Sequence, residues 1–295
     1  MPAQKIDNTL RYDEPMSKHT SWRVGGIADI FFTPGSRAEL IDFVKAQPDD
    51  MPFMFVGLGS NLLVRDGGIR GAVIAISPVM GQLEHKGDGL VSAEAGLACT
   101  VLARNCVRWG VGPAEFFAGI PGTVGGALAM NAGAFGGETW DNVVSVETLN
   151  RAGEVHTRES SEFETGYRYV TGPANEEWFL GAQFKFEAGF DTDMSHMRSL
   201  VQERKVKQPL GLPSCGSVFR NPEGDHAARL IEASGLKGFR MGGAEVSPKH
   251  ANFIINTDDA SAADIESLIN HVQAQVEEQH GISLQREVRI VGEAL

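Results

Sequence analysis

The chain is poor in cysteine, and the three cysteines it has are not spaced as pairs. Cys99, Cys106 and Cys215 form no Cys-x-x-Cys motif within the 295 residues. If one helix carries both Cys99 and Cys106, they lie about 10.5 Å apart along its axis, which exceeds the reach of a disulfide. An odd, unpaired set of cysteines fits a reducing compartment.

Long apolar runs are also absent. No segment approaches the ~18 consecutive apolar residues of a membrane-spanning helix, and residues 1–15 contain no apolar core of a secretory signal. We therefore expect a cytoplasmic protein with no lipid anchor and no membrane insertion.

The chain lacks an excess of positive charge and lacks paired histidines. Its net charge of −12 argues against binding to nucleic acid or to an anionic membrane, because both require a basic face. A phosphate-bearing ligand is still compatible with this charge if backbone amides and a few placed cations bind it. The histidines, among them His19 and His250, show no His-x-His or His-x-x-x-His spacing, so we predict no metal site.

The length allows two domains, or one large domain with a smaller partner. Periodicity and turn residues predict strands at 27–32, 53–56, 72–76, 90–95, 143–149, 154–157, 179–186, 251–256 and 284–291. Helices are expected after a capping box at 36–39, at 100–109, at 194–206, between Asp225 and Gly235, and at 261–280. Strands followed by helices in each half indicate an α+β fold with a boundary near 190–195.

Two glycine-rich segments are candidates for an anion site. The sequence GLGSN at 57–61 follows an expected strand and lacks both the GxGxxG and the GK[ST] pattern. Taken alone, it is more typical of a tight turn than of a phosphate site. The second segment, 118–138, has seven glycines in twenty-one residues, with Pro121 at an expected helix start. It fits an anion cradle and a close-packed helix under a glycine-rich loop equally well.

The order of several motifs resembles one enzyme family. GLGSNLLVRDGGIRG (57–71), GIPGTVGGALAMNAGAFGGE (119–138), GYRY (166–169), PSCGSVFRNP (213–222) and LQREVRIVG (284–292) look like the UDP-N-acetylenolpyruvoylglucosamine reductases of bacterial peptidoglycan synthesis. The resemblance runs from about Thr20 to Gly292. It implies a leader at 1–19 and an FAD-binding module of the p-cresol methylhydroxylase/vanillyl-alcohol oxidase type at 20–190, with α+β lobes at about 20–80 and 81–190. A C-terminal α+β substrate-binding domain at 195–295 would follow.

The same resemblance implies the residues that bind FAD. They are Arg23, Gly57, Gly59, Ser60, Asn61, Leu62, Gly119, Ile120, Pro121, Gly122, Gly125, Gly126 and Asn131. Cys215 departs from the family, where Ala is common, and we expect a tolerated thiol that is open to oxidation beside the site.

The implied reaction reduces the enolpyruvyl double bond of UDP-N-acetylglucosamine enolpyruvate and gives UDP-N-acetylmuramate. NADPH would reduce the flavin, the flavin would pass a hydride to the vinyl carbon, and a proton would reach the carbon beside the carboxylate. Negative charge would then develop on that carboxylate, so a fixed cation and an acid aimed at it are expected.

Three residues match those roles. Arg168 would be the cation, Glu287 a carboxylic acid kept protonated by burial, and Ser217 the proton donor. From the residues alone, each has an ordinary alternative: a surface Arg near a turn, a Glu on a solvated strand face paired with Arg286 or Arg289, and a turn Ser.

The resemblance also implies the substrate contacts. We assign them to Tyr167, Lys205, Gln208 and Asn221, although a solvated helix end explains the basic cluster around Arg204 and Lys207 nearly as well. No long insertion follows Tyr169, which matches the type of the family that lacks a substrate-closing loop. No protein partner is implied beyond the substrate and NADPH.

Two other functions remain open from the sequence. One is a flavin oxidase on the same FAD fold, which air would rapidly reoxidise. The other is a catalytically silent UDP-sugar sensor, which would bind the sugar nucleotide without colour or NADPH turnover.

Overall fold

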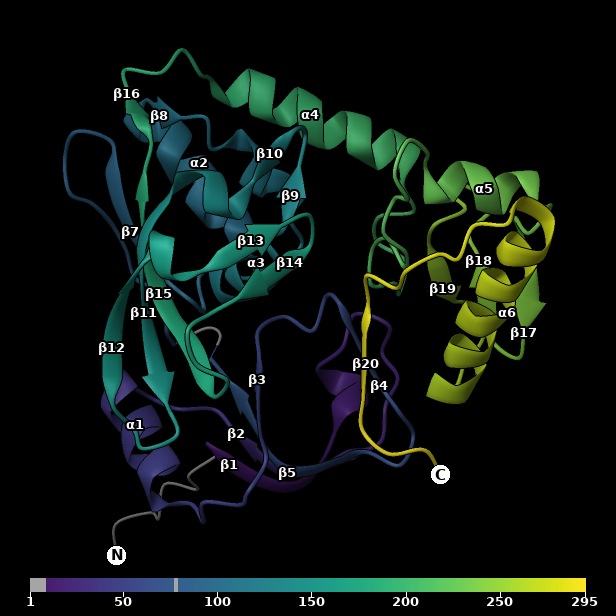
Figure 1. Ribbon diagram of the computed structural model, residues 1–295, viewed down its shortest axis with the longest axis horizontal. Coiled ribbons are helices and arrows are strands. Elements are labelled where there is room, and N and C mark those ends of the chain that lie inside the picture. Colours follow the sequence, from purple (N-terminus) through teal and green to yellow (C-terminus); the bar gives the residue numbers. More distant parts are fainter. Residues whose placement is uncertain (1–8, 77–78) are drawn as a thin grey trace, which may run out of the picture.

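The computed structural model describes residues 9–76 and 79–295. It contains two sheet-based lobes and a C-terminal α+β part, which the long helix α4 (Met194–Lys207) connects (Figure 1). The first eight residues of the predicted leader lie outside the described residues. The rest of it includes β1 (Leu10–Pro15) and the 3-10 helix η1 (Met16–Lys18).

The first lobe is a four-stranded sheet in the order β1-β2-β5-β3. Its strands β2 (Ile27–Phe32), β5 (Ile69–Ala75) and β3 (Phe53–Val56) are parallel, and β1 pairs with β2 antiparallel. Helix α1 (Arg37–Ala46) begins at Ser36, whose hydroxyl accepts from the Glu39 N–H at 3.1 Å. Only this half of the predicted capping box forms, because the Glu39 carboxylate accepts from the Gly35 N–H instead.

The second lobe is an antiparallel sheet in the order β12-β11-β15-β7-β6. Its strands are β6 (Leu83–His85), β7 (Leu90–Glu94), β11 (Val143–Asn150), β12 (Val155–Glu159) and β15 (Glu177–Lys185). Helices α2 (Cys99–Trp109) and α3 (Val124–Met130) supply much of its core. Gly110 ends α2 in the left-handed conformation, with φ of 64°, as its sequence position predicts.

Short elements complete this lobe. The paired strands are β8 (Val111–Gly112) with β16 (Glu187–Ala188), β9 (Gly133–Ala134) with β10 (Gly137–Glu138), and β13 (Glu164–Gly166) with β14 (Tyr169–Thr171). The 3-10 helices are η2 (Glu115–Gly119), η3 (Thr139–Asn142) and η4 (Ser160–Glu162).

The C-terminal part packs two helices with a small antiparallel sheet. The helices are α5 (Ala227–Ala233) and α6 (Ala262–His280), and the strands are β17 (Arg240–Met241), β18 (Ala244–Val246) and β19 (Ile254–Asn256). Trp22 and Leu63 of the first lobe share its core. The last strand, β20 (Arg289–Val291), returns to the first lobe and pairs in parallel with β4 (Leu62–Val64).

Two predicted strands are shorter than expected. Residues 284–288 are not strand, because this segment changes partners along its length. Glu287 N–H donates to the Val218 carbonyl at 2.8 Å, whereas Arg289 N–H donates to the Asn61 carbonyl at 3.1 Å. Likewise, β19 starts at Ile254 rather than at residue 251. Helix α3 begins after Thr123, so Pro121 precedes the helix instead of starting it.

Candidate active site

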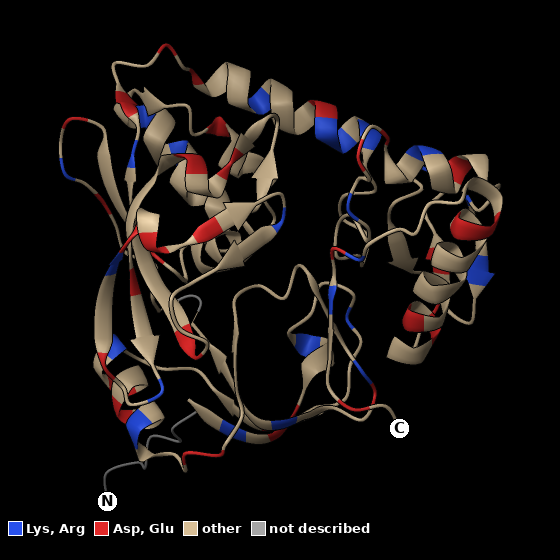
Figure 2. Cartoon of the chain, viewed as in Figure 1, with Lys and Arg blue, Asp and Glu red and all other residues tan. Residues whose placement is uncertain are grey.

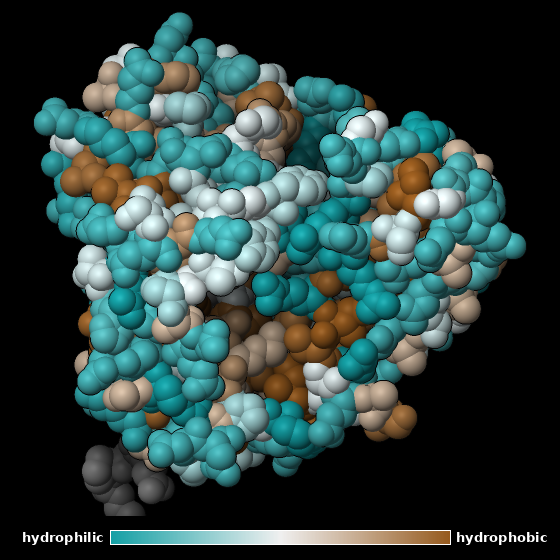
Figure 3. Space-filling model, viewed as in Figure 1, coloured by the Kyte–Doolittle hydropathy of each residue, from teal (hydrophilic) through white to brown (hydrophobic). Residues whose placement is uncertain are grey.

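A cavity of about 790 Å³ is bounded by residues of both lobes, α4 and the C-terminal part. On the face drawn in Figure 3, apolar residues line a hollow in the region where Figure 1 draws β3. The predicted site residues that line the cavity are Gly57, Gly59, Ser60, Asn61, Leu62, Gly119, Ile120, Pro121, Gly122, Gly125, Gly126, Arg168, Gln208, Ser217 and Glu287. The structure therefore brings residues of all five family motifs to one cavity.

The loop at 57–61 offers backbone donors to the cavity. Gly59 has φ of +60°, and a Cβ there would lie 2.0 Å from the His19 carbonyl oxygen, so only glycine fits. Within the described residues, the N–H groups of Leu58, Gly59 and Ser60 have no protein acceptor. Free amides on such a loop are suited to bind a phosphate group.

The segment at 119–126 lies against this loop, since a Cβ on Gly57 would be 2.5 Å from the Thr123 hydroxyl. The first amides of α3 are already used. Val124 N–H donates to Leu97 and Gly125 N–H to Ala95, each at 2.8 Å, and Gly126 N–H donates to the Thr123 hydroxyl at 3.4 Å. These three amides are therefore not available to a ligand, in contrast to the amides of the 57–61 loop.

Arg168 and Glu287 form a half-buried ion pair beside the cavity. Arg168 Nε lies 2.8 Å from Glu287 Oε1, and the side chains are 15% and 16% exposed. The other guanidinium nitrogens donate to the carbonyls of Asn131 at 3.3 Å and Gly133 at 3.1 Å. Burial raises the pKa of the Glu287 carboxyl, and the nearby cations Arg168 and Arg220 only partly oppose this. Burial thus disfavours the ionised form of Glu287, which the contact with Arg168 stabilises.

The segment carrying Ser217 is held beside Glu287 by backbone bonds. Val218 carbonyl accepts from the Glu287 N–H at 2.8 Å, and the Asn61 amide donates to the Glu287 carbonyl at 3.0 Å. The buried Asn252 accepts from the Phe219 N–H at 2.9 Å and donates to the Phe219 carbonyl at 2.8 Å. Within the described residues, the Ser217 hydroxyl has no protein partner. Sequence analysis missed Asn252, because a single Asn in an apolar segment carries no spacing signal.

Five predicted residues lie outside the cavity lining, and their roles stay predictions. They are Arg23, Asn131, Tyr167, Lys205 and Asn221. Asn131 is 3% exposed, and its amide donates to Glu138 at 2.8 Å and to the Gly166 carbonyl at 3.1 Å. Asn221 accepts from the Ala227 N–H at 3.1 Å, at the start of α5. Arg23 and Lys205 are exposed, and Tyr167 is 46% exposed next to Arg168.

One face of α4 lines the cavity, and Lys205 is not on that face. Its residues there are Glu203, Arg204, Lys207 and Gln208, at helical spacings of three and four. Figure 2 shows Lys and Arg gathered toward the C-terminal end of this helix. Arg204 Nε donates to Gln208 Oε1 at 2.5 Å, and burial lowers the pKa of Arg204. Lys207 lies one helical turn from Arg204 and shares its face, whereas Lys205 does not line the cavity. Helical periodicity in the basic cluster is the sequence signal that could have shown this difference.

Cys215 is less reactive than expected from its position. It is 3% exposed, and its sulfur lies 3.4 Å from the Leu62 carbonyl oxygen. Burial raises its thiol pKa to about 12. Because the thiolate is the reactive form, the expected oxidation liability is wrong for this conformation.

The described residues, 9–76 and 79–295, offer neither a metal-binding cluster nor a membrane-spanning helix. No group of three or more His, Cys, Asp or Glu side chains there is arranged to hold a metal ion. No helix in this part of the chain has the length and apolar character to span a membrane.

Comparisons with known proteins define first the class and then the family. The FAD binding domain model matches residues 28–158, over both lobes. The UDP-N-acetylenolpyruvoylglucosamine reductase C-terminal domain model matches residues 208–291. An FAD-binding domain joined to this second domain makes the chain an FAD-dependent oxidoreductase, with the predicted α+β fold.

Relatives along almost the whole chain identify the family. UDP-N-acetylenolpyruvoylglucosamine reductase of Alkalilimnicola ehrlichii is 55% identical over 286 residues, which are 97% of this chain and 95% of the relative. The enzyme of that name from Methylococcus capsulatus is 52% identical over 95% of this chain and 92% of its own. The crystal structure of the Thermus caldophilus reductase is 31% identical with a TM-score of 0.81, and covers 95% of this chain and 99% of that one. The chain belongs to the UDP-N-acetylenolpyruvoylglucosamine reductase family, as the motif order predicted.

Proposed function

We propose that this protein reduces UDP-N-acetylenolpyruvoylglucosamine to UDP-N-acetylmuramate, with NADPH as the source of the hydride, in peptidoglycan precursor synthesis. The observation that carries the proposal is the meeting of the Arg168–Glu287 pair and the Ser217 segment at a glycine-lined cavity. Each of these groups comes from a motif that is distant in the sequence.

The cavity fits FAD. Its volume of about 790 Å³ is within the usual range of small-molecule sites. The amides of Leu58, Gly59 and Ser60, which have no acceptor in the part of the chain that the structure describes, could bind the diphosphate. When bound, FAD would supply the redox chemistry, because it can accept a hydride from NADPH and pass one to the substrate. Gly126, which is exposed and lines the cavity, leaves room for the cofactor beside α3.

The chain's own residues would manage the charge and the proton. Arg168, fixed by the Asn131 and Gly133 carbonyls, would hold the substrate carboxylate through its permanent charge. Glu287, whose carboxyl pKa is raised by burial, would share the negative charge that develops there. The Ser217 hydroxyl, which no group among the described residues binds, would give its proton to the carbon beside the carboxylate.

The substrate diphosphate would meet the cationic face of α4. Arg204, Lys207 and Gln208 line the cavity and supply donors of the kind that bind phosphate oxygens. Tyr167, Lys205 and Asn221 are outside that lining, so we rank them below this face as substrate contacts. The proposal implies a cytoplasmic enzyme, and its three free, buried cysteines fit a reducing compartment.

A spectrum of the purified protein tests the proposal. We expect a flavin absorbance band that NADPH bleaches without oxygen, and that UDP-N-acetylenolpyruvoylglucosamine then restores. Recovery only in air would support the flavin oxidase instead. A protein that binds the UDP-sugar but takes up no FAD would favour the silent sensor.

A further inference from the structure

The loop at 57–61 lies between two chemically different parts of the cavity. The loop follows β3, and Phe53 and Phe55 of this strand are among the residues that line the cavity. Its last residue, Asn61, donates to the Glu287 carbonyl at 3.0 Å. The aromatic part therefore adjoins the start of the loop, and the Arg168–Glu287 pair adjoins its end.

Trp178 is the largest side chain of the aromatic part. Its ring stacks on Phe55, with centroids 4.8 Å apart and 16° between planes, and meets Phe53 edge-on at 5.6 Å. It is only half-buried although it lines the cavity, and within the described residues its indole N–H has no acceptor. By contrast, the indole N–H groups of the buried Trp22 and Trp140 donate to backbone carbonyls.

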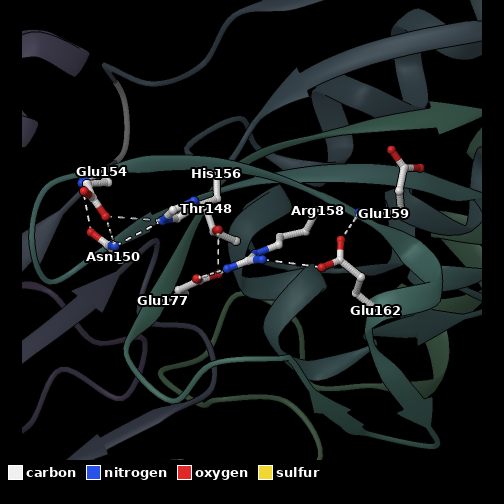
Figure 4. Close-up of polar contacts among 8 residues, drawn as sticks. All are labelled: Thr148, Asn150, Glu154, His156, Arg158, Glu159, Glu162 and Glu177. Carbon is white, nitrogen blue, oxygen red and sulfur yellow. Dashed lines mark hydrogen bonds and ion pairs between the residues drawn. The ribbon is translucent and has the colours of Figure 1, made fainter.

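Polar contacts fix the strand end that carries Trp178. Figure 4 shows the neighbouring Glu177 held by Arg158 and Thr148. Arg158 Nη2 lies 2.5 Å and its Nε 3.2 Å from the two Glu177 oxygens, and the Thr148 hydroxyl donates at 2.7 Å. In the ladder of β15 with β11, Trp178 pairs with Leu149. These contacts fix the backbone at Trp178, and the ring itself packs on Phe55. Both limit the freedom that the ring would lose when a ligand stacks on it.

We propose that Trp178, backed by Phe55, is the stacking surface for the adenine of FAD and selects FAD over FMN. The inference rests on the proposed function. In FAD the diphosphate separates adenine from the flavin ring. If the 57–61 loop binds the diphosphate and the flavin lies toward the Arg168–Glu287 pair, adenine falls on the aromatic part. A flat, apolar ring face is what a purine base stacks on.

The test measures binding and needs no turnover. Flavin-free protein is titrated calorimetrically with FAD, with FMN, which has no adenine, and with ADP, which has no flavin. We expect Trp178→Leu to raise the Kd for FAD about 5- to 150-fold, to weaken ADP in parallel, and to leave the Kd for FMN nearly unchanged. Trp178→Phe, which keeps a ring, regains most of the FAD affinity.

Trp109→Leu is the matched control, because Trp109 is also half-buried and stacked, on His85 at 5.2 Å, but does not line the cavity. It should leave all three affinities unchanged. Equal weakening of FAD and FMN by Trp178→Leu, or unchanged binding of ADP to this variant, would overturn the proposal. A wild-type protein that binds FMN and FAD equally, with no ADP binding, overturns it while leaving the proposed reductase function standing. Binding of neither flavin would sink both.

Discussion

Ser217 lines the cavity, and its hydroxyl has no hydrogen-bond partner among the described residues, which suits a group that gives its proton to a substrate. We predict that Ser217→Ala leaves reduction of the flavin by NADPH intact and slows its reoxidation by the enolpyruvyl substrate by about 10²- to 10⁴-fold, the usual contribution of a placed acid. Stopped-flow absorbance follows each half-reaction separately. Equal slowing of both would remove Ser217 from the proton-donor role.

Glu287 should make stability depend on pH. Because burial raises its carboxyl pKa in the folded state, the folded protein binds the proton more tightly than the unfolded chain does. Its contribution is fully present below the ordinary carboxyl pKa and is lost as pH rises through the raised value. We therefore expect the free energy of unfolding of the wild type, relative to Glu287→Gln, to fall with rising pH over that window.

Urea unfolding at several pH values, with both proteins free of flavin, measures this difference. The exposed Glu223 has no protein partner among the described residues, so Glu223→Gln is the control for replacing a solvated carboxyl. A difference for Glu287→Gln that rises with pH would mean that pairing with Arg168 outweighs burial. If Glu287→Gln turned over as fast as the wild type, Glu287 would have no role in the reaction.

The two adjacent glycines of α3 have different neighbours. A Cβ on Gly125 would lie 2.9 Å from Ala95 Cβ, whereas one on Gly126 meets nothing closer than 3.7 Å. We predict that Gly126→Leu projects a side chain into the cavity and lowers FAD occupancy more than tenfold while the fold stays stable. Gly125→Leu should instead destabilise the fold by about 1–3 kcal/mol through overpacking.

Flavin absorbance per protein and thermal unfolding distinguish the two effects. Gly125 is thus a poor probe of the cofactor site, although the sequence motif predicts the same cofactor-binding role for Gly125 and Gly126. Full FAD occupancy in Gly126→Leu would mean that the cofactor does not pass beside α3.

The lysines of α4 make a matched pair. Lys207 lines the cavity and pairs with Glu203 at 2.5 Å, while Lys205 is exposed outside the lining. We expect Lys207→Met to raise the KM for the UDP substrate by roughly 3- to 10-fold, a modest effect because Lys207 is largely solvated. Lys205→Met should change it little. A larger rise in KM for Lys205→Met than for Lys207→Met would mean that Lys205 binds the substrate diphosphate, as the sequence suggested.

The C-terminal part is tied to the first lobe at several places. Asp66 accepts from the Ala262 and Ala263 N–H groups, each at 2.9 Å, at the start of α6. Arg65 makes two 2.8 Å bonds to Glu266 in the same helix. Together with the pairing of β20 and β4, these contacts fix the segment carrying Glu287 over the cavity.

We predict that Asp66→Ala lowers the free energy of unfolding by about 0.5–2 kcal/mol, as loss of a helix cap does. Urea unfolding should remain a single transition, because the two parts share the core around Trp22 and Leu63. The exposed Asp49, replaced by Ala, is the control and should have no effect. Two separate transitions in Asp66→Ala would show that the parts unfold independently.

The family, the α+β class, the long helices and most of the longer strands follow from the sequence alone, whereas many of the short strands do not. Local signals were enough for these: Ser36 and Ser261 begin helices, and Gly110 and Gly281 end them. Such signals act within one turn of the chain, so they are readable without the fold. The order of the glycine motifs likewise needed no structure.

Only the tertiary structure decided which residues face the cavity. Burial and pairing depend on groups that are distant in sequence: Glu287 meets Arg168 and Val218, and Gly125 meets Ala95. The Phe55–Trp178 stack joins two lobes, and no spacing in the sequence predicts it. The chain therefore carries its chemistry in short motifs, while long-range packing determines which of their atoms are free to act.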